Sequence, residues 1–211
     1  MTAGFTGIPE EALEFWTGLA ADNSKAYWTA HRSEFDRYVA TPTQELVDAL
    51  SGEFGPLKVF RPYRDVRFSH DKQPYKLQTS LVTTESERGL LYLQLGLDGL
   101  LVAGGFYQPD TATLSSFRTA VDEPRVAASF DRITQTLAGE GLNLDGDPLR
   151  TAPRGWPKDH PRIDLLRLRN LALARHEPLQ EWMHTPRLLD EGQATWRRLQ
   201  TWNEWLREHV R

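Results

Sequence analysis

Two runs of mostly apolar residues, separated by one Asp-Gly pair, constrain the fold of this chain more than any other feature. The first run is Leu90 to Leu97 and the second is Leu100 to Tyr107, with Asp98-Gly99 between them. Asp-Gly readily adopts the positive φ angles that a tight hairpin turn requires. The pattern therefore predicts an antiparallel β-hairpin. Because both faces of these strands carry apolar residues, we expect the hairpin to be covered on both sides.

The segments around the hairpin complete an α+β pattern. Short extended segments are predicted at 57–60, 65–68, 79–83 and 171–175. Apolar residues at helical spacing predict N-terminal helices, one capped by Asp22 or Asn23 and another opened by the capping box Thr41-Pro42-Thr43-Gln44. Further helices are predicted to start near Asp110, Pro124, Pro161 and Thr185-Pro186. Helices, then a mainly antiparallel sheet, then helices packed on that sheet favour α+β over α/β.

Length and composition narrow the class of protein. A chain of 211 residues suits one domain, so we expect a single domain over 1–211. The chain has no cysteine, which excludes disulfides and cysteine-based metal sites. No secretory signal and no apolar stretch of membrane-spanning length is visible, so a cytoplasmic protein without membrane contact is expected. Nucleotide-binding glycine motifs, a nucleophile elbow and paired metal-ligand histidines are missing, so we expect no cofactor and no metal.

Charge is concentrated in two segments. The chain carries a net charge of −4, yet residues 58–76 carry +4 and residues 150–175 carry +5. A mildly acidic protein with two basic segments favours a local site for an anion over a whole-surface binder of polyanions. Nucleic acid is therefore not favoured as a partner, and the sequence leaves the oligomeric state open.

The densest chemistry lies between Arg64 and Lys76. If 65–69 is a strand, alternate side chains share one face, and several cations can converge on one phosphate or carboxylate. The predicted ligand-binding residues are Arg64, Arg67, Ser69, Lys72, Tyr75 and Lys76. Asp65 and Asp71 would hold the cations in place as structural ion pairs, or bind a divalent metal. The alternative is an ion-pair network that is only structural.

Two further segments are candidates for the same anion site. Gly104-Gly105 permits a close approach of the backbone to a ligand, with Arg118 in reach, although close packing is the favoured explanation of the two glycines. Arg154, Lys158 and His160 lie in a proline-stiffened loop before a helix, where they either bind an anion or are merely solvated.

Three functions remain open. The first is a module that binds a small anionic ligand, phosphorylated or carboxylated. The second is an enzyme of phosphoryl or phosphodiester chemistry, with Asp71 or His70 as acid or base and Arg64 and Arg67 stabilising developing charge. The third is a protein-interaction module that uses the Trp-rich C-terminal helix, with Trp196, Trp202 and Trp205.

The motifs in these segments resemble those of a known family. The run R-D-x-R-F-S-x-D-K-x-P-Y-K is matched without a break from Arg64 to Lys76. Gly104-Gly105-x-Tyr107-x-Pro109, Pro153-x-Gly155 and Asp159-His160-Pro161 match as well. The chain thus resembles an uncharacterised bacterial and fungal family, catalogued as domain of unknown function 2461. It departs from the pattern at Ala103, where a third glycine is usual, and at Arg154, where lysine is usual. The resemblance supports the fold and implies no activity, cofactor or catalytic residue.

Overall fold

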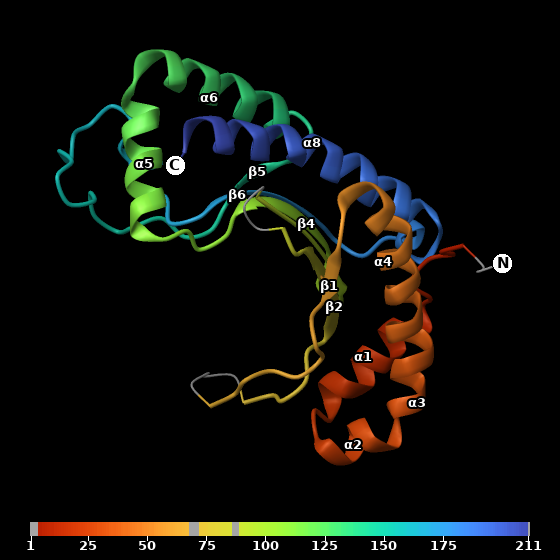
Figure 1. Ribbon diagram of the computed structural model, residues 1–211. Coiled ribbons are helices and arrows are strands. Elements are labelled where there is room, and N and C mark those ends of the chain that lie inside the picture. Colours follow the sequence, from red (N-terminus) through yellow and green to blue (C-terminus); the bar gives the residue numbers. More distant parts are fainter. Residues whose placement is uncertain (1–3, 68–71, 86–88, 211) are drawn as a thin grey trace. The chain divides into compact units, whose positions relative to one another are not determined.

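A computed structural model describes residues 4–67, 72–85 and 89–210, and its strands form one six-stranded sheet (Figure 1). The strand order is β1-β2-β3-β4-β6-β5, and the pairs β1–β2, β2–β3 and β5–β6 are antiparallel. The strands are β1 Leu57–Val59, β2 Gln78–Thr83, β3 Leu90–Gly96, β4 Gly99–Phe106, β5 Asn143–Asp145 and β6 Leu171–Glu177.

Helices precede and follow the sheet, as the predicted α+β class requires. Before it lie α1 Glu11–Ala21, α2 Lys25–Ala30, α3 Arg32–Glu34 and α4 Thr41–Phe54. After β4 lie α5 Thr111–Asp122, α6 Pro124–Ala138, α7 Ile163–Leu166, a 3₁₀ turn Glu181–His184 and α8 Arg187–His209. Within the described part of the chain, no helix has both the length and the apolar character needed to cross a bilayer.

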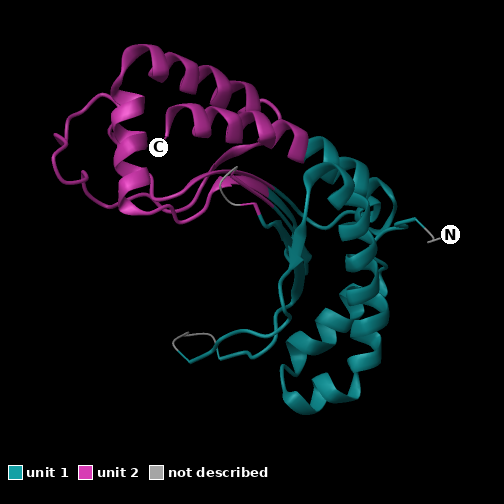
Figure 2. Ribbon diagram, viewed as in Figure 1, with its two compact units in different colours: residues 1–84, 92–102, 176–195 teal, residues 85–91, 103–175, 196–211 magenta. Residues whose placement is uncertain are grey.

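The chain divides into two compact units, which are described separately (Figure 2). Unit 1 comprises residues 1–84, 92–102 and 176–195, and unit 2 comprises residues 85–91, 103–175 and 196–211. The expectation of one domain over 1–211 stays a prediction.

In unit 1, one face of the sheet is buried under helices and the other is partly open. Leu93 is buried in β3 and lies next to Gly192 of α8, where an added Cβ would be 3.1 Å from its Cδ1. The Thr43 hydroxyl of α4 donates to Thr79 of β2 at 3.0 Å. Tyr92 and Gln94, which point to the opposite face, are only half-buried. The expectation that the strands are covered on both sides is therefore wrong for this part of β3.

The hairpin is confirmed, but its turn lies one residue earlier than predicted. Leu97 and Asp98 form the turn, and Gly99 is the first residue of β4, with φ +100°. A Cβ on Gly99 would lie 2.1 Å from the carbonyl oxygen of Glu177. This residue must therefore be glycine both for its own backbone angle and for the close passage of a distant segment.

The capping box at Thr41 does not open a helix. Residues 32–54 are helical throughout, with a π-helical segment Phe35–Ala40 immediately before α4. Both the backbone N–H and the hydroxyl of Thr41 bond to the carbonyl of Asp36. Pro42 has no N–H to donate, and the wider π turn accommodates its ring without ending the helix.

Residues 60–77, here called the basic arm, leave β1 and return to β2 without forming the strand predicted at 65–68. Residues 65–67 are not in a strand, and Phe68 lies outside the described residues. Among the described residues of the arm, pairing occurs instead at an isolated antiparallel bridge between Tyr63 and Tyr75. Two backbone bonds of 2.8 Å flank this bridge, from Arg64 N–H to Pro74 and from Lys76 N–H to Pro62.

The side-chain amide of Asn23 holds the arm by its main chain. Its Oδ1 accepts the N–H of Tyr75 at 2.9 Å, and its Nδ2 donates to the carbonyl of Tyr75 at 3.1 Å. The Tyr75 ring stacks on Trp28 at 4.5 Å, with the ring planes 9° apart. Asn23 was expected to cap α2, but that cap is Ser24, whose hydroxyl accepts the N–H of Tyr27.

In unit 2, the tryptophans of α8 belong to the interior of the unit. Trp196 and Trp202 are fully buried, and Trp205 is nearly so. Trp202 donates its ring N–H to the carbonyl of Leu171, and Trp205 donates to the hydroxyl of Ser129 at 2.8 Å. These side chains are thus already covered by their own chain.

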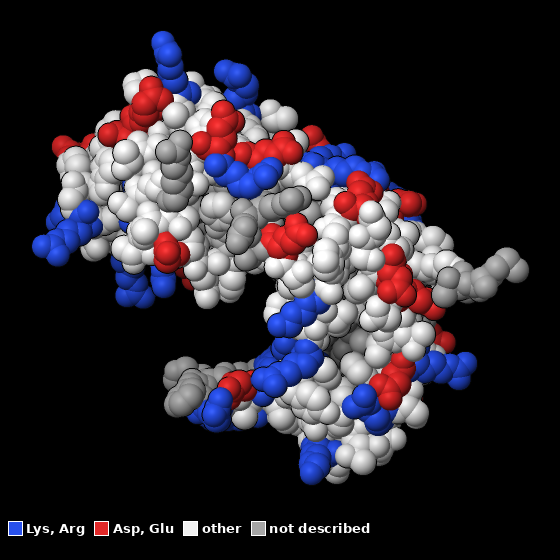
Figure 3. All heavy atoms as spheres, viewed as in Figure 1, with Lys and Arg blue, Asp and Glu red and all other residues white. Residues whose placement is uncertain are grey.

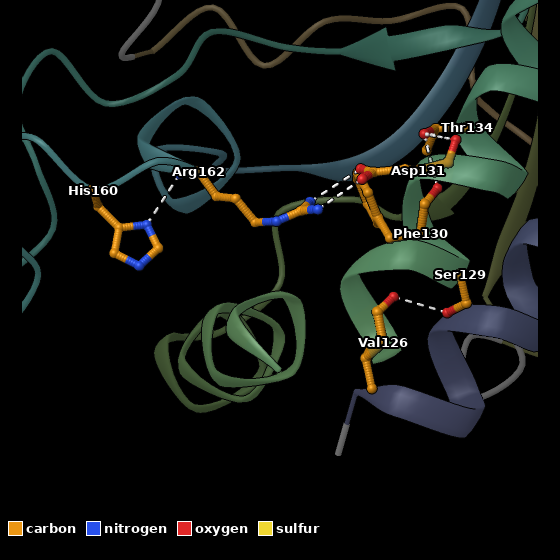
Figure 4. A network of polar contacts seen from close by, with 7 residues as sticks. All are labelled: Val126, Ser129, Phe130, Asp131, Thr134, His160 and Arg162. Carbon is orange, nitrogen blue, oxygen red and sulfur yellow. Dashed lines mark hydrogen bonds and ion pairs between the residues drawn. The ribbon is translucent and has the colours of Figure 1, made fainter. Parts of the chain in front are cut away.

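The proline-rich segment 146–162 of unit 2 is attached at both ends. At its start, Leu149 exchanges bonds with Arg167, whose guanidinium reaches the Leu149 carbonyl. At its end, Arg162 forms a bidentate ion pair with Asp131 of α6, at 3.0 and 2.6 Å (Figure 4). The segment is therefore anchored to the rest of unit 2 near both of its ends.

We expect Asn23→Ala to destabilise unit 1, because it leaves the N–H and the carbonyl of Tyr75 without their partner. The cost should be about 1–3 kcal/mol, which corresponds to a fall in Tm of roughly 2–4 °C per kcal/mol. Asn23→Asp keeps the acceptor for the Tyr75 N–H and should lose less. Thermal unfolding followed by circular dichroism measures both variants. An unchanged Tm for Asn23→Ala would contradict the role of this clamp.

We expect the contribution of the Arg162–Asp131 pair to depend on pH. The hydrogen bond from Arg162 lowers the pKa of Asp131, so the pair stabilises the fold above the ordinary carboxyl pKa and loses its effect as the pH falls through the lowered value. Asp131→Asn should cost at most about 1 kcal/mol at pH 7, because the pair is partly exposed. In urea titrations, the difference from the parent protein should shrink as the pH falls below about 4. A difference that grows in acid would contradict this assignment.

Candidate functional site

The basic arm has one side that attaches it and another that carries positive charge. Tyr63 and Tyr75 are bridge partners, and their rings contact each other at 5.3 Å and both contact Trp28. Neighbouring side chains in an extended segment alternate between faces, so Arg64 and Lys76 point away from the tyrosine side. Figure 3 shows Lys and Arg side chains gathered along the arm.

Positive charges act on one another at the base of the arm. The pKa of Lys76 is lowered, first by burial and then by the Arg61 and Arg64 guanidiniums. The ammonium of Lys76 lies 5.2 Å from the ring centroid of Phe60, and that of Lys58 lies 5.9 Å from the same ring. This surface of the arm therefore favours an incoming negative charge.

Nearer the tip, the predicted site residues form a local ion pair. Arg67 binds Asp65 in a bidentate pair at 2.9 and 2.7 Å, and its N–H also bonds to the same carboxylate. This pairing lowers the pKa of Asp65. Lys72 donates to the carbonyl of Val66 at 3.1 Å. These contacts close the arm on itself.

Three of the predicted residues lie outside the described part of the chain. They are the ligand candidate Ser69 and the two acid–base candidates, His70 and Asp71. Tyr75, also predicted to bind ligand, is described and is 5% exposed. Its ring and its backbone are both used to attach the arm, so Tyr75 positions the charged residues beside it.

Sequence reasoning missed the half-buried polar side chains on the open face of β2 and β3. Tyr92 donates its hydroxyl to Oε1 of Gln94 at 2.7 Å, and Gln78 donates its amide to the same oxygen at 3.1 Å. Phe60 meets Tyr92 edge to face at 6.1 Å. We call the surface formed by Gln78, Tyr92 and Gln94, together with the adjoining ring of Phe60, the polar face. The alternation of Tyr92 and Gln94 with leucines is the signal that could have revealed it.

The adjacent glycines Gly104 and Gly105 of β4 are explained by packing within unit 2. A Cβ on Gly105, where φ is +136°, would lie 2.1 Å from the carbonyl oxygen of Leu171. On Gly104 it would lie 3.0 Å from Cβ of Leu199. Arg118 donates to the carbonyl of Leu166 at 2.8 Å, and burial lowers the pKa of its guanidinium.

The second basic segment is in unit 2, whereas the arm is in unit 1, so each is treated as a separate surface. His160 uses both ring nitrogens: Nδ1 accepts the N–H of Arg162 at 3.1 Å, and Nε2 lies 3.0 Å from a carboxylate oxygen of Asp122. The first contact requires an unprotonated Nδ1, which places the ring proton on Nε2. Arg154 and Lys158 are exposed.

Among the described residues, no group of three or more His, Asp or Glu side chains is arranged to hold a metal ion. What the described geometry offers is therefore a set of cations and a neighbouring set of neutral hydrogen-bonding groups. The cations can bind an anion, and the neutral groups can orient the rest of the molecule that carries it.

The chain is similar to a known protein family. Neither a curated protein nor a solved structure matches the chain significantly. The model of the family described as "Conserved hypothetical protein (DUF2461)" matches residues 11–205, a range that contains the basic arm, the polar face, Gly104 and Gly105. Because this match covers nearly the whole sequence, the chain belongs to the DUF2461 family.

Proposed function

We propose that this protein binds a small anionic ligand, phosphorylated or carboxylated, at the base of the basic arm through Arg61, Arg64 and Lys76. The observation that carries the proposal is the arrangement of these three cations, in which both arginines act on a partly buried lysine. Arginine guanidiniums suit the oxygens of phosphate and carboxylate groups, with which they form paired hydrogen bonds.

The direction of the electrostatic effect favours a binding site over a structural network. In a structural ion pair, the opposite charge raises the pKa of a lysine. At Lys76, burial and two like charges lower the pKa, so the charged side chain is disfavoured when nothing is bound. A bound anion would remove this penalty. Arrangements that cost stability and that packing does not require are typical of functional sites.

The attachment of the arm supports the same proposal. The Asn23 clamp and the stacking on Trp28 fix Tyr75. Backbone hydrogen bonds from Arg64 and Lys76 lie on the two sides of the bridge. Because Arg64 and Lys76 directly follow the bridged tyrosines, their backbone positions are set before a ligand arrives. Less conformational entropy is then lost on binding.

Phosphoryl or phosphodiester chemistry at the same surface is a hypothesis that the described residues do not advance, because His70 and Asp71 lie outside them. A partner-binding role for the tryptophans of α8 receives no support from their burial. Binding is therefore the function that the described geometry supports best.

We expect Lys76→Met to abolish binding of inorganic phosphate without lowering Tm in the absence of ligand. Removing a disfavoured charge should leave Tm unchanged or raise it, by up to about 2 °C for a fraction of a kcal/mol. Isothermal titration calorimetry with phosphate and a thermal melt measure the two effects. Lys25→Met, on an exposed lysine of α2, is the matched control and should bind normally. A lower Tm together with unchanged phosphate binding would identify Lys76 as structural.

Binding of sulfate, which does not titrate in this range, should depend on pH. Because the pKa of Lys76 is lowered, its positive charge is lost at a pH below the usual lysine value of about 10.5. Sulfate affinity should therefore fall as the pH rises from 7 toward 10 and should fall less in Lys76→Arg, whose guanidinium stays protonated. If the parent protein and Lys76→Arg show the same pH profile, Lys76 is not the titrating group.

A further inference from the structure

The charged base of the arm continues directly into the polar face of β2 and β3. The ammonium of Lys76 lies over Phe60, and Phe60 meets Tyr92 edge to face. The hydroxyl of Tyr92 then reaches Gln94, which also bonds to Gln78. Each step is a direct contact inside unit 1, so a ligand of modest size held by the cations would also lie over the polar face.

The residues of this face point away from the covered side of the sheet. Gln78 of β2 and Gln94 of β3 alternate along their strands with the buried residues Thr79, Leu93 and Leu95. Both glutamines are half-buried, and so is Tyr92. Gly96, which is opposite Gln78 in the register, has no side chain, and a Cβ there would lie 2.4 Å from Cβ of Gln78. The backbone thus leaves room for the glutamine pair.

The glutamine pair offers one donor and one acceptor to a ligand. The bond between the two amides uses the nitrogen of Gln78 and the oxygen of Gln94, and Tyr92 donates to that same oxygen. The nitrogen of Gln94 and the oxygen of Gln78 have no hydrogen-bonding partner among the described residues. A donor beside an acceptor is complementary to the edge of a nucleobase, which glutamine and asparagine bind in the same paired manner.

The aromatic side chain in this series suits the same ligand. Phe60 is 37% exposed and lies between the lysines and Tyr92. A planar base can stack on an exposed ring, whereas inorganic phosphate and small carboxylates cannot use one. Along the surface the cations come first, and the aromatic ring and the amides, which both suit a base, come after them. This arrangement matches a ligand with a phosphate at one end and a base at the other.

We infer that the anionic ligand is a nucleoside phosphate, with its phosphate at Arg61, Arg64 and Lys76 and its base on the polar face against Gln78 and Gln94. This inference rests on the proposed function, because it assigns the rest of a ligand whose anionic group that proposal places. It goes further in requiring that neutral residues of β2 and β3 contribute to affinity.

The test compares ligands that share a phosphate and differ in the base. Isothermal titration calorimetry would use inorganic phosphate, ribose 5-phosphate and the 5′-monophosphates of adenosine, guanosine, cytidine and uridine. At least one nucleotide should bind about tenfold more tightly than ribose 5-phosphate, the contribution expected from one well-placed pair of hydrogen bonds.

Variants then locate the base. Gln94→Leu should reduce nucleotide affinity to that of ribose 5-phosphate and leave phosphate affinity unchanged. Gln94→Glu removes the same N–H donor at nearly constant shape and should also reduce nucleotide affinity. This second variant keeps the test decisive if Gln94→Leu does not fold. Gln44→Leu, on an exposed glutamine of α4, is the control and should bind as the parent protein does.

The outcomes separate this inference from the proposed function. If phosphate binds through Lys76 but no nucleotide binds more tightly than ribose 5-phosphate, the base assignment is overturned and the anion site stands. If neither phosphate nor any nucleotide binds, both are overturned. If single-stranded DNA binds more tightly than every mononucleotide, the assignment to a small ligand is overturned. Nucleotide binding that is lost in both Gln94 variants and kept in the control supports the inference.

Discussion

The pair of hydrogen bonds between Asn23 and the main chain of Tyr75 is the constraint on which the rest of the candidate surface depends. A side-chain amide here supplies the donor and the acceptor that a neighbouring strand would otherwise supply. With Tyr75 fixed and its ring on Trp28, the bridge to Tyr63 sets the direction of the returning chain. The charged side chains beside the bridge then project from the opposite side.

That attachment also explains how the fold keeps an electrostatically unfavourable group in place. Lys76 is disfavoured in its charged form by burial and by two guanidiniums. Its backbone is nonetheless held by the bond to Pro62, and its ammonium lies over the ring of Phe60. Aromatic packing and backbone hydrogen bonds thus offset the repulsion between the charged side chains. The contacts that build the surface are therefore different from the charged groups that a ligand would bind.

Local sequence signals predicted the elements whose cause is local, and missed those whose cause is a distant contact. The cap at Asp110, the start of α6 after Glu123, strand β2 and the hairpin all follow from neighbouring residues. The turn lies at Leu97 and Asp98, and Gly99 passes close to Glu177, a distant contact that no local pattern contains. The strand predicted at 65–68 of the arm is a similar case. The arm is held through Tyr75, whose partner Asn23 is 52 residues away in the sequence. Within the site, the sequence predicted the charged residues, but it did not predict the hydrogen-bonded pair Gln78 and Gln94.

The 52-residue separation between Asn23 and Tyr75 has a consequence for how this surface forms. Closing a contact so distant along the chain costs loop entropy that a local contact does not. Before it closes, Arg61, Arg64 and Lys76 are solvated charges on a flexible chain with no common orientation. The surface is therefore a property of the native state alone. Anything that occupies it selects folded molecules from the ensemble and shifts the folding equilibrium toward them in proportion to its concentration.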